Sequence, residues 1–271
     1  MEIAFDKMEG AGNDFVVIDN RDGRFPTPGK VDFVRDCCRS RLGIGADGVI
    51  FLEPDREFDF AWDFYNRDGS RAEMCGNGAR CVAKFANRVG AAGDSMTFRT
   101  LAGPISATLT DIGAKVGLLP ADLPATSTRV EIPGETIELW SLNTGVPHVV
   151  VKVADLEAVD VATVGRALRY HPAFQPAGTN ANFFDITPDG KVRIRTYERG
   201  VENETLACGT GSVATSLVAG RFFALPSPVT VITRGGDELR VYFQINASGR
   251  ADPVYLEGGA RRVFSGMVEI P

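Results

Sequence analysis

The sequence has few of the residues from which metal centres and disulfide frameworks are built. It contains only two histidines, His148 and His171, and its five cysteines include no Cys-x-x-Cys pair. Zinc sites usually draw their ligands from such closely spaced residues, and an odd cysteine count in a long chain argues against a disulfide framework. We therefore expect thiols and no metal site, with Cys37, Cys38 and Cys81 serving as small buried apolar residues.

The sequence also lacks an excess of basic charge and any long apolar run. Its 29 basic and 35 acidic residues give a net charge of −6, without a block of like charge. Binding to a nucleic-acid backbone requires a basic surface, so we expect no nucleic-acid partner. No window approaches 18 uncharged apolar residues, and the first residues contain no apolar core of signal-peptide length. These absences predict a cytoplasmic protein with no membrane partner.

What the sequence does contain is enough apolar material for a sizeable core, with 44% hydrophobic residues in 271. Helical spacing of apolar residues occurs at residues 31–41 and 155–169, and again behind Cys75 and Cys208. From residue 95 onward most of the chain reads as short strands bounded by Gly, Pro, Asp or Asn. This pattern favours an α+β fold of antiparallel sheet with few helices over a parallel βαβ array.

A cysteine motif that occurs twice organises the chain. Cys-Gly-Asn-Gly at residues 75–78 recurs as Cys-Gly-Thr-Gly at residues 208–211, and a tyrosine precedes each motif by ten or eleven residues. The duplication predicts two pseudo-symmetric domains, residues 1–119 and 120–261. The sequence leaves open whether the last strand, residues 262–271, packs back on the first domain.

The position of these cysteines suggests acid–base chemistry. A cysteine where a glycine-rich loop becomes a helix lies beside free backbone N–H groups and the positive end of the helix dipole, which stabilise a thiolate. If the two domains close face to face, an amino-acid carboxylate held there would place its α-carbon between the two sulfurs. One sulfur would remove the α-proton and the other would deliver a proton to the opposite face. This predicts a racemase or epimerase with Cys75 and Cys208 as catalytic bases and no obligatory cofactor.

A thiol near its ordinary pKa is a weak base at neutral pH, so each cysteine needs support. His148 and Glu198 are the candidates, because the repeat pairs His148 with Asn13 and Glu198 with Asn66. The alternatives are that His148 only caps a turn at a strand start and that Glu198 is a solvated surface charge.

Five separated segments of the chain resemble the diaminopimelate epimerase family. They are residues 13–17, 73–81, 147–148, 197–200 and 207–211. The resemblance implies two similar domains, each a β-barrel-like sheet around a central helix, with the active site between them and a homodimer as the usual assembly. It also implies interconversion of LL- and meso-diaminopimelate without pyridoxal phosphate, in the synthesis of lysine and the peptidoglycan precursor.

The same resemblance assigns substrate-binding roles. Backbone N–H groups of the two glycine loops would hold the reacting carboxylate, and five side chains would grip the substrate, four of them mainly at its distal end. The loop residues are Gly76, Asn77, Gly209 and Thr210, and the side chains are Asn13 and the distal set Asn66, Asn180, Glu198 and Arg199. Two positions depart from some family members, which carry glutamine in place of Gly48 and asparagine in place of Val146.

Two other functions are compatible with these residues. A related racemase could act on another amino acid, such as histidine. In a non-enzymatic alternative, Cys75 and Cys208 would form a thiol redox switch by oxidation to a disulfide.

Overall fold

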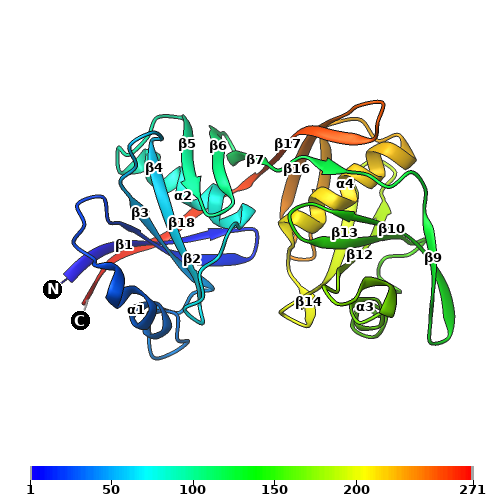
Figure 1. Ribbon diagram of the computed structural model, residues 1–271, viewed down its shortest axis with the longest axis horizontal. Helices are drawn as coiled ribbons and strands as arrows, with labels where there is room; N and C mark the ends of the chain where they lie inside the picture. The colour runs from blue at the N-terminus through cyan, green and yellow to red at the C-terminus, as the bar shows by residue number, and fades with distance from the viewer. Residues whose placement is uncertain (1, 270–271) are drawn as a thin grey trace. The chain divides into compact units, whose positions relative to one another are not determined.

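The computed structural model describes residues 2–269, in which short strands far outnumber helices (Figure 1). The predicted α+β fold with few helices is therefore confirmed. The chain forms two compact units, one made of the residues up to Gly117 together with those from Gly258 onward, and the other of Leu118–Glu257. None of the helices within residues 2–269 has the length and apolar character that a membrane span requires.

The first unit wraps a sheet around one helix, α2. Strand β1 pairs antiparallel with β2 and β18, β2 runs parallel to β3, β3 antiparallel to β4, β4 parallel to β5, and β5, β6 and β7 follow antiparallel. The elements are β1 (Glu2–Gly10), β2 (Asn13–Asp19), η1 (Thr27–Gly29), α1 (Lys30–Cys37), β3 (Gly48–Glu53), β4 (Phe60–Asn66), α2 (Gly76–Arg88), β5 (Ser95–Thr100), β6 (Gly103–Thr110), β7 (Gly113–Leu118) and β18 (Arg261–Glu269). Residues 270 and 271 of the predicted last strand lie outside the described residues.

The second unit repeats this order of pairings around α4. Strands β10 and β11 are antiparallel, β11 and β12 parallel, β12 and β13 antiparallel, β13 and β15 parallel, and β15, β16 and β17 antiparallel. The elements are β8 (Ala121–Asp122), β9 (Thr128–Ile132), β10 (Glu135–Asn143), β11 (Pro147–Lys152), α3 (Val161–Arg169), η2 (Pro172–Phe174), β12 (Asn180–Ile186), β13 (Val192–Glu198), β14 (Asn203–Thr205), α4 (Gly209–Phe223), β15 (Val229–Ile232), β16 (Glu238–Ile245) and β17 (Arg250–Gly259).

The parallel pairs were not predicted from the sequence. Each lies across a connection that carries a helix, because two parallel neighbours need a crossover that returns the chain to the same end of the sheet. Helices α1 and α2 fill these connections in the first unit, and α3 and α4 fill them in the second.

The two central helices are enclosed by their sheets. All residues of α4 from Gly211 to Ala219 are buried, and so are most residues of α2. A helix that is buried all round must be covered on all sides, unlike an amphipathic helix lying on one face of a sheet. Within the first unit α2 contacts β1, β2, β3 and β6, and within the second α4 contacts β10 to β13, β15 and β16.

The strand registers correct one equivalence drawn from the repeat. In the first unit Asn66 pairs with Gly48. In the second unit Ala181 pairs with Tyr197, so the next position along the two strands places Glu198 beside Asn180. Gly48 in turn pairs with Phe15, and Asn180 pairs with His148. His148 therefore corresponds to Phe15 and not to Asn13. The position equivalent to Asn13 is Val146, where some family members carry asparagine.

The peripheral helices are shorter than their apolar patterns predicted. The pattern at 155–169 yields α3 only from Val161, because the Asp160 side chain accepts a hydrogen bond from the Thr163 N–H at 3.0 Å and so caps the helix start. Cys37, Cys38 and Cys81 are buried, as predicted for small apolar residues.

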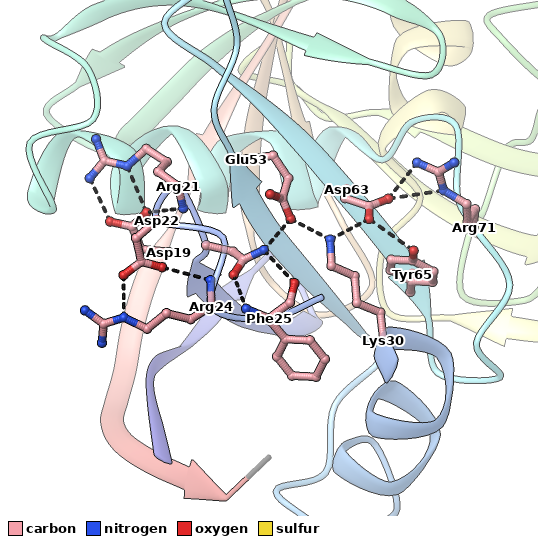
Figure 2. Close-up of polar contacts among 11 residues, drawn as sticks. Asp19, Arg21, Asp22, Arg24, Phe25, Lys30, Glu53, Asp63, Tyr65 and Arg71 are labelled. Atoms are coloured by element: carbon pink, nitrogen blue, oxygen red, sulfur yellow. Dashed lines mark hydrogen bonds and ion pairs between the residues drawn. The ribbon is translucent and has the colours of Figure 1, made fainter. Parts of the chain in front are cut away.

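A buried cluster of charges fixes α1 to the first sheet (Figure 2). Lys30, at the start of α1 and only 2% exposed, places its Nζ 2.5 Å from Glu53 Oε1 and 2.9 Å from Asp63 Oδ2. Asp63 also accepts hydrogen bonds from Tyr65 Oη at 3.0 Å and Arg71 Nη2 at 2.7 Å. One ammonium group thus links carboxylates from β3 and β4, and the Arg71 guanidinium supplies the second positive charge.

Replacing this lysine with an apolar residue of similar length is expected to destabilise the first unit. Lys30→Met should lower the free energy of unfolding by about 3 kcal/mol, because removing one partner of a buried pair leaves an uncompensated charge. Urea unfolding measures the change. Arg39→Met, which removes an exposed charge 3.6 Å from Asp36, should stay within about 0.5 kcal/mol.

The loss of stability in Lys30→Met should also depend on pH. Burial alone would raise the pKa of Asp63, but hydrogen bonds and charge from Lys30 and Arg71 hold it below its usual range. Stability from a depressed carboxyl pKa is present above the unfolded pKa, about 4, and is lost as the pH falls further. The difference in the free energy of unfolding between wild type and Lys30→Met should therefore become smaller below about pH 4. If wild type and Lys30→Met had the same free energy of unfolding at pH 7, or if the difference grew in acid, this account of the cluster would be contradicted.

Candidate active site

Cys75 occupies the N-cap of α2. Its backbone is extended, with φ −148° and ψ 118°, and Gly76 is the first helical residue. Its Sγ accepts a weak hydrogen bond from the Gly78 N–H at 3.5 Å. A Cβ on Gly78 would come within 3.2 Å of Ile50 Cδ1, so glycine allows the helix start to approach β3 closely. The cysteine thus lies among backbone donors at the positive end of the helix.

A chain of hydrogen bonds fixes the polar side chains next to this helix start. Asn13 Nδ2 donates to Asp47 Oδ2 at 2.8 Å, Asn77 Nδ2 donates to Asn13 Oδ1 at 2.8 Å, and Arg80 Nη2 donates to Asn77 Oδ1 at 2.9 Å. Arg80 is completely buried. Its guanidinium adds positive charge to the end of α2 that already favours anions.

Sequence analysis assigned Asn13 and Asn77 to substrate binding, and the structure brings these two side chains into direct contact. It missed Asp47 and Arg80, which orient them. The available signal was Arg80 itself, an arginine between Ala79 and Cys81 near the start of the predicted helix.

Cys208 occupies the equivalent N-cap of α4. Its backbone is again extended, with φ −129° and ψ 109°, and the residue is 7% exposed. Its Sγ lies 3.6 Å from Thr210 Oγ1. The first turn is held by Ser212 Oγ, which donates to the Cys208 carbonyl at 2.9 Å, and by Thr144 Oγ1, which donates to the Thr210 carbonyl at 3.0 Å. Gly209 and Thr210 are thereby placed at the helix start, as predicted from the repeat.

Three of the predicted distal residues come together where β12 begins and β13 ends. Asn180 Oδ1 accepts a hydrogen bond from the Arg199 N–H at 2.8 Å, and its Nδ2 donates to the Pro147 carbonyl at 3.1 Å. Glu198 precedes Arg199, and its Oε2 accepts from Thr205 Oγ1 at 2.9 Å. A carboxylate and a guanidinium on adjacent residues can bind an ammonium and a carboxylate of one ligand.

Asn66 lies in the other unit, at the end of β4. Its Nδ2 donates to Ser70 Oγ at 3.1 Å, and the neighbouring strand position is Gly48. A Cβ on Gly48 would lie 2.5 Å from the Tyr65 carbonyl and 2.7 Å from the Phe64 ring. The packing of β3 against β4 therefore leaves no room in this chain for the glutamine that some family members carry at position 48.

His148 is fully buried in β11. Its Nδ1 lies 3.1 Å from Asn182 Nδ2, while its Nε2 has no hydrogen-bond partner among residues 2–269. Burial, together with the positive charge of Arg199, lowers the pKa of His148 to about 3. The imidazole is consequently neutral at physiological pH. Asn182 is a further residue that sequence analysis did not single out.

The five cysteines should differ sharply in reactivity. Burial raises the pKa of Cys37 and Cys81 to about 12 and that of Cys38 to about 11. At pH 8 about one in 10³ to 10⁴ of such thiols is ionised, and the thiolate is the nucleophile. Iodoacetamide should therefore modify half-buried Cys75 in the native protein and leave these three intact, as judged by mass spectrometry of peptides.

The same reaction in guanidinium chloride is the control, and it should label all five cysteines. If Cys81 were modified in the native protein as fast as Cys75, the predicted difference in reactivity between the two thiols would be wrong.

Comparison with known proteins identifies the family. The family model described as diaminopimelate epimerase matches residues 5–121 and 140–263. The diaminopimelate epimerase of Aquifex aeolicus is 45% identical, over 97% of this chain and 96% of its own length. That of Archaeoglobus fulgidus is 40% identical, over 100% of this chain and 98% of its own length.

Solved structures share the fold at much lower identity. A hydroxyproline epimerase from Agrobacterium vitis superposes with a TM-score of 0.69 and 18% identity, over 98% of this chain and 92% of its own. A phenazine biosynthesis protein of the PhzF family from Bacillus anthracis gives 0.76 and 15%, over the whole of both chains. With full-length curated relatives at 40% identity and above, the chain belongs to the diaminopimelate epimerase family.

Proposed function

We propose that this protein is an isomerase that converts LL-diaminopimelate to meso-diaminopimelate without a cofactor. The observation that carries the proposal is the matched pair of cysteines, each at the N-cap of an enclosed helix in a unit of the same topology. The names of the full-length relatives supply the substrate. The product would serve the synthesis of lysine and of the peptidoglycan precursor.

The reaction uses one sulfur on each face of the substrate. The thiolate of one cysteine takes the α-proton, so that the C–H bond breaks and an S–H bond forms. The electron pair left on the α-carbon spreads into the carboxylate, and the thiol of the other cysteine then delivers its proton to the opposite face. Cys75 and Cys208 exchange the roles of acid and base between the two directions of the reaction, which requires both sulfurs to reach one α-carbon.

The helix starts stabilise the transition state. Backbone N–H groups of Gly76, Asn77, Gly209 and Thr210 would donate to the reacting carboxylate, where negative charge accumulates as the C–H bond breaks. Donors fixed before the reaction stabilise that charge without reorganisation, and they bind the transition state more tightly than the substrate. The buried Arg80, bonded to Asn77, strengthens this field in the first unit.

The distal end of the substrate distinguishes a diamino acid from smaller amino acids. Arg199 suits the distal carboxylate, because a planar guanidinium can bind it through two hydrogen bonds, and Glu198 suits the distal ammonium. Asn180, which is bonded to the Arg199 backbone, and Asn66 would complete this part of the site, with Asn13 nearer the reacting centre. Glu198 also serves as an acid–base partner of Cys208, and His148 supports the reaction as a neutral imidazole.

We further infer a cytoplasmic homodimer. The strand β18 exposes Val263, Phe264 and Met267, and apolar side chains gathered on one exposed strand favour contact with another copy of the chain.

Serine substitutions test the two sulfurs individually. Cys75→Ser and Cys208→Ser should each lower kcat for LL-diaminopimelate by at least about 10³-fold, because a hydroxyl is a far weaker base and proton transfer typically contributes 10²- to 10⁴-fold. Chromatographic separation of the LL and meso isomers measures turnover. Cys81→Ala, which changes a buried cysteine six residues from Cys75, should retain activity per folded molecule.

The outcomes separate this proposal from its alternatives. Turnover of L-histidine in preference to LL-diaminopimelate would indicate a related racemase. Wild-type activity in either serine variant would remove that cysteine from the mechanism. A reduced protein inactive on every amino acid, whose two cysteines oxidise reversibly, would favour a redox switch.

A further inference from the structure

The residues beneath the two central helices differ in character between the units. The strand registers make Phe15 equivalent to His148, Ile50 to Asn182 and Phe64 to Thr196. In the first unit all three are apolar, and the rings of Phe15 and Phe64 pack edge to face at 5.7 Å. In the second unit all three are polar. One copy of the repeat therefore replaces an apolar contact under its helix with a hydrogen-bonded group.

Asn182 is the centre of this buried group. Its Nδ2 donates to the Val149 carbonyl at 2.9 Å and lies 3.1 Å from His148 Nδ1, and its Oδ1 accepts from Thr196 Oγ1 at 3.0 Å. Asn182 and His148 are both completely buried. Burying such groups is unfavourable unless they are bonded, and every polar atom of the Asn182 side chain is bonded here.

These partners determine which way the amide points. The Val149 carbonyl can only accept, so the NH₂ group of Asn182 must face it and the Oδ1 must face Thr196. The second hydrogen of the same NH₂ group then points at His148 Nδ1. That nitrogen must accept, and in a neutral imidazole the ring proton consequently resides on Nε2.

Asn182 also lies against the start of α4. A Cβ on Gly211 would come within 2.3 Å of Asn182 Oδ1 and 3.2 Å of Cys208 Sγ. The missing side chain of Gly211 thus makes room for the Asn182 amide next to the catalytic cysteine proposed above. The equivalent Gly78 is approached instead by the apolar end of Ile50.

We propose that Asn182 is a positioning residue, which holds His148 as the Nε2–H tautomer so that its buried N–H can donate to an anionic acceptor during the reaction. The catalytic role given to His148 rests on the proposed function, whereas the tautomer and the hydrogen bonds of Asn182 do not depend on it. An N–H donor without charge stabilises a thiolate or a carboxylate that forms or binds nearby, and it requires no change of protonation. The orphaned Nε2 of His148 is the atom left available for this role.

Nitrogen NMR of the substrate-free protein tests the tautomer directly. The chain has two histidines, so His171→Gln in a ¹⁵N-histidine-labelled protein leaves a single imidazole to observe. We expect Nε2 to carry the proton and Nδ1 to show the shift of an unprotonated acceptor. A proton on Nδ1 would overturn the inference.

Two variants then test the part played by Asn182. Asn182→Asp places a carboxylate oxygen opposite Nδ1 and should move the proton to Nδ1, with a fall in kcat of about tenfold or more and little change in KM, as for loss of an interaction made in the transition state. Thr196→Val is the matched control, since it removes the bond to Oδ1 and keeps both donors. It should keep the Nε2–H tautomer. The same tautomer in Asn182→Asp as in wild type would show that Asn182 does not set it.

Ligand addition identifies the acceptor. A downfield shift of the Nε2–H proton on adding diaminopimelate would indicate a substrate carboxylate, and a shift on raising the pH without substrate would indicate a thiolate. No shift in either experiment would overturn the donor role. Because the tautomer is observed without turnover, a protein with the Nε2–H tautomer but no epimerase activity would refute the proposed function and leave this geometry standing.

Discussion

The structure depends on two largely buried helices that each follow a cysteine at the N-cap. An enclosed helix has backbone N–H groups in its first turn with no partner inside the helix, and a side chain or a ligand must satisfy them. Serine, threonine, aspartate and asparagine are the usual caps, and each stabilises a helix by about 1 kcal/mol relative to alanine. Cysteine is a weaker acceptor. Both central helices therefore have a weaker cap, and the first helical residue of each, Gly76 or Gly209, is only partly buried.

The second unit is a modified copy of the first. In the first unit the polar groups beside the helix start form a chain from Asp47 to Arg80, and the residues beneath are apolar. In the second unit the polar group lies beneath the helix, around Asn182, and the helix above it is buried from Gly211 to Ala219. Duplication supplies two equivalent sulfurs. The divergence of these buried residues gives the two sulfurs different surroundings.

Much of this architecture could be predicted because it follows from local patterns. The two helix starts, the α+β class and the buried thiols were all visible in glycine placement and apolar spacing. The parallel strand pairs were not, since pairing depends on the crossovers that surround each helix. His148 was paired with Asn13 because two glycine-containing turns look alike, but a turn's composition does not fix strand register. Asn182 and Arg80 lie within apolar runs, and their roles arise only where separate elements meet.

The central claim is that two sulfurs act on opposite faces of one carbon, and isotope content in the first turnovers tests it most directly. Reduced protein is mixed with LL-diaminopimelate in deuterated water and quenched at low conversion. If two bases act, the meso product carries deuterium at the inverted carbon from the outset, while the remaining LL isomer retains its proton. Early meso product that keeps the substrate's own proton at that carbon would mean that a single base moves it from one face to the other, and the account would be wrong.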